Sequence, residues 1–142
     1  MDADLQHHPR YLPQIVNLYF KKNLDFVVAS RNFNEDVGLG IVRKSASILL
    51  SYIFNYFLGY RVSDPMSGFF MFRKLIYYKS RNHLFRKGWK ILADFIYNKK
   101  KYVIEEVQIK FMRRLKNKSK MNIKVLINII QLFLFKFKKL KI

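Results

Sequence analysis

Two carboxylates and an amide stand close together at the start of the sequence, at Asp2, Asp4 and Gln6. In an extended strand these alternate residues share one face, and a turn after Asp4 would gather all three around one ligand. Pro9 and Pro13 favour such a turn. Mg²⁺ and Mn²⁺ prefer oxygen ligands and keep waters and substrate phosphates, so one carboxylate and one amide oxygen suffice. Asp4 and Gln6 are therefore our candidate ligands for Mg or Mn.

The acidic pair has two other interpretations. Carboxylates at the end of a strand are often only solvated, without any ligand. A phosphatase-type Asp-x-Asp is a further option, but the hydroxyl residue usual after such a pair is replaced here by Leu5.

Composition limits the class of protein. The chain has 142 residues, of which 51% are hydrophobic and 17% aromatic, so it is long enough for one small domain with a core. Its 28 Lys and Arg against 9 Asp and Glu give a formal charge of +19, which favours nucleic acid, anionic membranes or phosphorylated substrates. The lack of cysteine excludes disulfides and thiolate sites. We expect no signal peptide, because the first residues are acidic.

Hydrophobic patterning predicts an α/β fold. We expect a truncated strand running into Asp2, a helix over residues 13–22 with Ile15, Val16 and Tyr19 on one side, and a buried strand over residues 24–29. Two strands joined by a helix form a parallel, right-handed crossover unit. Ligands of such sheets bind at the carboxyl ends of the strands, where Asp2 and its neighbours and Ser30-Arg31 would lie.

A first amphipathic helix is expected after a polar, glycine-bearing loop over residues 32–40. Ser47, Ser51 and Asn55 recur every four residues and leave a wide apolar and aromatic surface on the other side. This surface belongs either to the core or to a bilayer interface. The apolar stretch is too short to span a membrane.

A second amphipathic helix is expected over residues 122–139. The segment contains no acidic residue, its apolar face is broad, and lysines cluster at its end. The members are Lys124, Asn128, Gln131 and Lys138 on the polar stripe, Ile123, Leu126, Ile127, Ile130, Phe133, Leu134 and Phe137 opposite, and Lys136, Lys138, Lys139 and Lys141 at the end. Such a helix is typical of an anionic membrane surface, and a soluble helix docked on the sheet is the alternative.

Between these helices, a Pro- and Gly-punctuated loop at 63–68 leads into a short aromatic strand at 69–73. Asp64 in this loop would orient a sugar hydroxyl or an arginine, or it would only cap the turn. A helix over 89–98, strands at 102–104 and 107–111, and a basic loop over 113–120 follow.

Taken in order, these motifs resemble family 2 glycosyltransferases of the dolichyl-phosphate mannosyltransferase type. The matching segments are residues 2–9, 28–31, Arg43 with Ser47, 63–70, 88–92, 106–111, Arg114 and 119–120. The resemblance implies a truncated GT-A, Rossmann-like sheet with flanking helices, in which residues 1–121 form a partial catalytic domain and residues 122–142 a basic amphipathic C-terminal helix. One or both amphipathic helices would lie at a membrane interface, on its cytoplasmic face.

The resemblance also implies an activity. It is the metal-dependent, inverting transfer of mannose or another hexose from a nucleotide diphosphate sugar, with GDP-mannose favoured, to dolichyl or another polyprenyl phosphate. The residues carried over as catalytic are Asp4, Arg43 and Arg114.

The remaining site residues follow from the same resemblance. Those that would hold the nucleotide sugar are Asp2, Ala3, Asp4, Arg31, Arg114 and Lys120. Arg43 and Ser47 would grip the acceptor phosphate, and Asp64 and Lys90 have supporting roles. Asp4 and Gln6 remain the metal ligands.

The sequence departs from this family in one major way. The strands that normally precede the metal motif and build the base-binding half of the pocket are absent, so we expect little activity unless a separate polypeptide supplies them. The alternatives are half of a split enzyme and an inactive membrane-associated remnant. A nucleic-acid-binding module is less favoured, because we find no recognition helix or basic stripe with stacking aromatics, and we expect no nucleic-acid partner.

Overall fold

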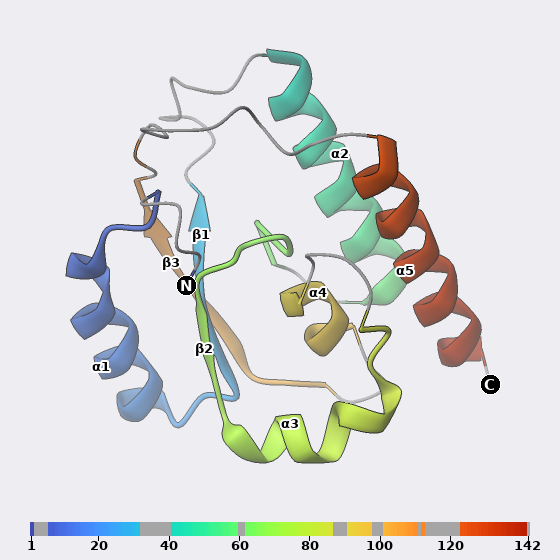
Figure 1. Ribbon diagram of the computed structural model, residues 1–142. Coiled ribbons are helices and arrows are strands. Elements are labelled where there is room, and N and C mark those ends of the chain that lie inside the picture. Colours follow the sequence, from blue (N-terminus) through green and yellow to red (C-terminus); the bar gives the residue numbers. More distant parts are fainter. Residues whose placement is uncertain are drawn as a thin grey trace.

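The computed structural model describes residues 1, 6–31, 41–59, 62–86, 91–97, 101–110, 112 and 123–141 (Figure 1). In the helices at 41–58 and 123–141 it describes the side chains of residues 45, 48–56 and 127–138. The elements, in order, are η1 (Pro9–Tyr11), α1 (Leu12–Lys22), β1 (Phe26–Arg31), α2 (Ile41–Leu58), β2 (Phe70–Phe72), α3 (Lys74–Ser80), η2 (Arg81–His83), α4 (Ile91–Ile96), β3 (Ile104–Ile109) and α5 (Ile123–Lys141).

Within the described residues, three strands form one mixed sheet in the order β2-β1-β3. The central strand β1 pairs antiparallel with β2, with Phe26 opposite Phe72, and parallel with β3, with Arg31 opposite Ile109. The predicted α/β class is confirmed. The truncated strand expected before Asp2 lies outside the described residues, so the parallel pair observed here is β1 with β3.

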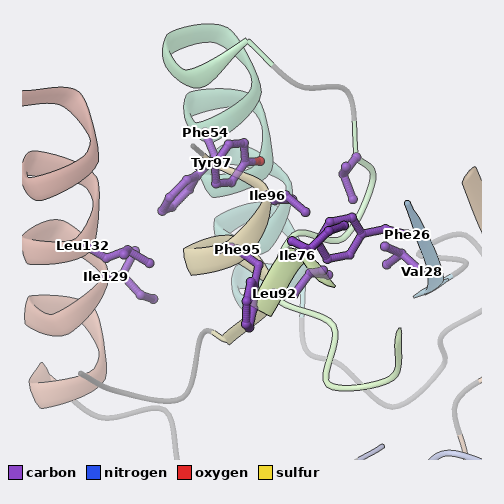
Figure 2. Close-up of a cluster of buried hydrophobic side chains, with 12 residues drawn as sticks. Phe26, Val28, Phe54, Ile76, Leu92, Phe95, Ile96, Tyr97, Ile129 and Leu132 are labelled. Carbon is purple, nitrogen blue, oxygen red and sulfur yellow. The ribbon is translucent and has the colours of Figure 1, made fainter. Parts of the chain in front are cut away.

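The sheet separates two hydrophobic clusters, because successive side chains of β1 point to opposite faces. Val27 and Ala29 pack with Ile15 of α1 on one face. Phe26 and Val28 belong to the larger cluster on the other face, which α2, α4 and α5 complete (Figures 1 and 2). All of residues 26–30 are consequently buried, as expected for a strand covered on both faces.

Helix α1 confirms the helix predicted over residues 13–22, and Pro13 lies in its first turn. It ends at Asn23, whose φ of 49° is left-handed and whose backbone N–H bonds the Phe20 carbonyl. Of the three residues expected on one side, Ile15 is buried and Tyr19 partly buried, whereas Val16 is 37% exposed. Ile15 and Val16 are consecutive, so their side chains point about 100° apart around the helix.

Helix α2 turns its polar stripe toward the protein. Ser51 is buried and Asn55 partly buried beside the buried Phe54, whereas Tyr52 and Tyr56 are 71% and 83% exposed. Leu49 is also exposed, so the outward stripe at positions 49, 52 and 56 is apolar and aromatic. One side of this helix therefore joins the core, as expected, and the bilayer interface stays a prediction for its outward side.

Helix α5 divides in the same way. Ile129 and Leu132 enter the larger cluster beside Phe54 and Tyr97 (Figure 2), and α5 packs against α2. Ile127, Ile130 and Leu134 are exposed, and they lie at the spacing of the outward stripe on α2. The helix therefore docks through one apolar row and leaves a second one uncovered. A boundary at residues 121 and 122 stays a prediction.

Lys136, one of the lysines clustered at the end of this helix, is buried. Its side chain is 2% exposed, and its Nζ lies 2.7 Å from Asp94 Oδ1 of α4 and donates to the Asp94 carbonyl at 2.6 Å. Asp94 also accepts from the backbone N–H groups of Phe85 and Arg86. The ion pair is thus fully bonded and fastens α5 to the domain.

Other elements differ in detail from expectation. The helix α3 was not predicted, because its sequence, with two adjacent tyrosines between lysines, has no clear period. The two late strands are one strand, β3, and the helix expected at 89–98 is observed as α4, Ile91–Ile96. No helix in the described part of the chain is sufficiently long and apolar to cross a membrane.

Lys136→Ala is expected to lower the free energy of unfolding by about 3–5 kcal/mol, because it leaves the Asp94 carboxylate buried without its cation. Urea denaturation followed by circular dichroism measures this change. The matched control is Lys138→Ala, an exposed lysine on the same helix, for which less than about 0.5 kcal/mol is expected. Equal losses in the two variants would contradict the role of the buried pair.

Candidate functional site

The carboxyl ends of β1 and β3 lie side by side, because the two strands are parallel and Arg31 is opposite Ile109. The start of the chain joins them at this edge. The Met112 N–H donates to the Gln6 carbonyl at 3.1 Å, and Gln6 Nε2 approaches the Met112 carbonyl at 3.4 Å. The structure thus brings Gln6, a predicted metal ligand, to the end of β3 that leads into the basic segment 113–120.

Arg31 is held at the same edge by Asp64. Its Nε lies 3.4 Å from Asp64 Oδ2, and the Asp64 side chain is only 6% exposed against 25% for that of Arg31. Asp64 Oδ1 also accepts from the Met66 N–H at 3.2 Å. Asp64 therefore caps its turn and also pairs with an arginine, whereas a contact with a sugar hydroxyl stays a prediction. The pair leaves a partly accessible guanidinium at the strand ends, a group suited to phosphate oxygens.

The loop that carries Asp64 is tied to the sheet at its far end. Ser67 Oγ donates to the Ala29 carbonyl of β1 at 2.6 Å and accepts from the Phe69 N–H at 3.2 Å. Both hydrogen bonds are buried, so they fix the position of the loop relative to the end of β1.

The near end of the loop is tied to α2 and β3. Asn55 of α2 accepts from the Val62 N–H at 3.2 Å and donates to the Val62 carbonyl at 2.9 Å. Glu106 of β3 accepts from the N–H of Ser63 at 2.8 Å and from its Oγ at 2.6 Å. The helix and the strand together fix the position of the two residues that precede Asp64.

Tyr97 completes this network from the end of α4. Its hydroxyl donates to Asn55 Oδ1 at 3.1 Å. Burial raises the pKa of Tyr97 far above its ordinary value, and the nearby Glu106 carboxylate raises it further. The phenol therefore keeps its proton at neutral pH and remains a donor to Asn55.

Sequence reasoning did not assign roles to Asn55, Glu106, Ser67 or His7. A signal existed for two of them: Asn55 continues the polar stripe of α2, and adjacent Glu105 and Glu106 on one strand must point to opposite faces. His7 is buried against Phe69, with ring centroids 5.3 Å apart, and so secures the turn after Gln6. Nothing in its local sequence distinguishes it from the exposed His8.

Several predicted site residues lie outside the described residues, namely Asp2, Ala3, Asp4, Lys90, Arg114 and Lys120. Arg43 and Ser47 lie in the first half of α2, and only their backbone is described. The described residues hold no cluster of three or more His, Cys, Asp or Glu side chains suited to a metal. Of the predicted metal ligands only Gln6 is placed, and its amide oxygen is of the type that Mg²⁺ and Mn²⁺ accept. The metal site stays a prediction.

Comparison with known proteins now decides the family. The family model described as "Glycosyl transferase family 2" matches residues 1–81, which is more than half of the chain and includes Gln6, Arg31 and Asp64. The chain belongs to glycosyltransferase family 2.

One of the curated proteins similar to this family 2 chain has a name that states a function. It is the "Dolichol-phosphate mannosyltransferase" of Mycosarcoma maydis, which is 29% identical over 150 aligned positions. The alignment covers 96% of this chain and 49% of the relative. The chain thus spans about half the length of the curated relative that it matches. Membership of family 2, predicted from the ordered motifs, is confirmed, and this relative is of the dolichyl-phosphate mannosyltransferase type that the same motifs resemble.

Ser67→Ala is expected to lower the free energy of unfolding by about 1–3 kcal/mol, because it leaves the buried Ala29 carbonyl without its donor. Chemical denaturation measures the loss. Gln108→Ala, at an exposed position of β3, is the control and is expected to cost less than about 0.5 kcal/mol. A Ser67→Ala protein as stable as the control would show that this bond does not anchor the loop.

Proposed function

We propose that this family 2 chain is the part of a polyprenyl-phosphate glycosyltransferase that holds the metal motif, a donor-phosphate arginine and the acceptor site. The donor is a nucleotide diphosphate hexose, with GDP-mannose favoured, and the acceptor is dolichyl or another polyprenyl phosphate. The observation that carries the proposal is Arg31, oriented by Asp64 at the same strand ends where Gln6 meets Met112. The family and the named relative support the same reaction class.

Charge compensation and positioning account for the chemistry. A phosphate acceptor is already ionised at neutral pH, so no strong general base is needed. Mg²⁺ or Mn²⁺ bound through Asp4 and Gln6 would neutralise charge on the leaving diphosphate. Arg31 would bind the donor phosphates together with Arg114 and Lys120. In-line attack on the anomeric carbon then inverts its configuration, and catalysis depends on holding both phosphate groups in place.

The nucleotide and the sugar would contact the remaining predicted residues. Asp2 and the Ala3 backbone would hold the nucleoside or the sugar. Lys90 and Asp64 have supporting roles, and for Asp64 that role is the orientation of Arg31.

The acceptor is proposed to bind along α2. Arg43 and Ser47 would grip its phosphate from the first half of this helix, and Leu49, Tyr52 and Tyr56 lie further along it, on its outward side. A lipid tail leaving the phosphate needs an apolar surface, and this stripe supplies one.

We propose that the same surface holds the protein on the cytoplasmic face of a membrane as a peripheral protein. The exposed row of α5 adds Ile127, Ile130 and Leu134 beside α2, with which α5 packs. The formal charge of +19 favours an anionic leaflet. The aromatic side chains suit the boundary between headgroups and acyl chains, because a tyrosine has an apolar ring and a polar tip.

Transfer by this chain is proposed to need polypeptide equivalent to the other half of the relative, supplied as a separate chain or in a longer one. The competing possibility is a membrane-associated remnant without activity. The two differ in whether transfer appears when the missing half is added.

With that half supplied, Asp4→Ala is expected to reduce Mg²⁺-dependent transfer of mannose from GDP-mannose to dolichyl phosphate by about 10²-fold or more, because the diphosphate loses its counter-charge. Radiolabel transfer into the lipid phase measures it. Asp25→Ala, which removes a carboxylate at the opposite end of β1, is the control and is expected to remain within about threefold. Full transfer by the Asp4 variant would reject the metal assignment.

The double variant Tyr52→Ser, Tyr56→Ser is expected to bind vesicles of phosphatidylserine and phosphatidylcholine about tenfold more weakly. A loss of roughly 60 Å² of buried apolar area has this effect at about 25 cal/mol per Å². Vesicle sedimentation measures the binding.

Phe20→Ser is the control, because Phe20 is an aromatic residue 70% exposed on α1, across the sheet from α2 and α5 (Figure 1). Equal weakening in both proteins, or unchanged binding in the double variant, would reject the assigned face.

A further inference from the structure

The Asp64 loop is held from β3 by a glutamate that makes two hydrogen bonds to one residue. Glu106 reaches from the middle of β3 to Ser63 and accepts two bonds from that one residue, from its N–H at 2.8 Å and its Oγ at 2.6 Å. Hydrogen bonds to an ionised carboxylate are about twice as strong as neutral ones. Two of them on one residue fix both its position and its rotation.

Ser63 directly precedes Asp64, so its orientation is passed on through a single peptide unit. The neighbouring anchors act elsewhere: Asn55 holds Val62, and Ser67 is tied to Ala29. Between these two anchors, Glu106 is the side chain that sets the backbone at Ser63. That backbone determines whether the Asp64 carboxylate reaches Arg31 Nε, 3.4 Å away.

The adjacent residue shows that this contact is specific to Glu106. Glu105 points to the other face of β3 and pairs at 2.6 Å with Lys22 of α1, where both side chains are well exposed. An exposed pair of this kind contributes little stability. The chain therefore offers two neighbouring glutamates, of which only one touches the loop.

We propose that Glu106 is a positioning residue: through Ser63 it fixes the loop that places Asp64 on Arg31, and so it holds the Arg31 guanidinium in place for a diphosphate. The assignment of a diphosphate rests on the proposed function, whereas the effect on the loop does not.

The test compares Glu106→Ala, Glu106→Gln and Glu105→Ala in the full chain. Glutamine keeps both contacts, because its amide oxygen accepts from the Ser63 N–H and its amide nitrogen donates to Ser63 Oγ, but it removes the charge. Alanine removes both contacts. A role in positioning thus predicts rescue by glutamine, and a role that needs the negative charge predicts none.

The first measurement is amide hydrogen exchange by NMR, together with the Arg31 Nε–H signal, without any ligand. In Glu106→Ala the Ser63 amide is expected to exchange about tenfold faster and the Arg31 signal to shift, whereas Glu106→Gln and Glu105→Ala stay within about threefold of the parent protein. Exchange at Val28, in the central strand, serves as the internal check that the fold is intact.

The second measurement is binding of inorganic pyrophosphate with Mg²⁺ by calorimetry. Affinity is expected to fall about tenfold in Glu106→Ala and to be retained in Glu106→Gln and Glu105→Ala. Should Glu106→Ala unfold, Ser63→Ala, which removes only the hydroxyl contact, is expected to give a smaller change in the same two measurements.

Unchanged exchange at Ser63 in Glu106→Ala, or equal losses in Glu106→Ala and Glu106→Gln, would overturn the positioning role. Parent protein that binds no pyrophosphate counts instead against the proposed function. In that case the exchange rates still decide whether Glu106 fixes the loop.

Discussion

The structure depends on the central strand β1, which is buried on both faces and paired on both edges. Its odd and even residues enter two different hydrophobic clusters, so the strand cannot shift by one residue without moving every side chain into the wrong cluster. This fixed register determines where Arg31 emerges. The loop with Asp64 is then built onto the end of the strand through Ser67 and Ala29. A partly accessible cation is thereby placed at the edge where ligands of α/β sheets bind.

Helix α2 shows how the same fold serves a surface and a site at once. One of its polar residues, Asn55, points inward and forms hydrogen bonds with the backbone N–H and carbonyl of Val62. These two backbone groups would otherwise lack these partners. Its aromatic residues are consequently left outside, at Tyr52 and Tyr56. The helix that presents this apolar stripe is thus hydrogen-bonded to the loop that carries Asp64. A proposed membrane surface and a proposed phosphate site are joined by one side chain.

The last helix, α5, buries a charged side chain. Lys136 is buried on the side of α5 that faces α4, where it pairs with Asp94, and the Asp94 carboxylate also accepts from the backbone N–H groups of Phe85 and Arg86. Removing a lysine from water is costly unless its partner is well bonded, and that condition is met only after α4 and α5 have packed together. Of the lysines clustered at the end of the helix, Lys136 is therefore buried and has a structural role, whereas Lys138 is exposed.

The sequence by itself determined the α/β class, the approximate place of α1, α2 and α5, and the buried strand β1, because hydrophobic period and turn chemistry are local properties. It also named Gln6, Arg31 and Asp64 as candidate site residues. It also indicated the family through the order of its motifs. Only the tertiary structure decided that Asp64 meets Arg31, that Glu106 and Asn55 hold the loop, that the polar stripe of α2 faces inward and that Lys136 is buried. Apart from Asn55 with Val62, these contacts join residues far apart in the chain, and the spacing of residues along a sequence does not say which distant residues will meet.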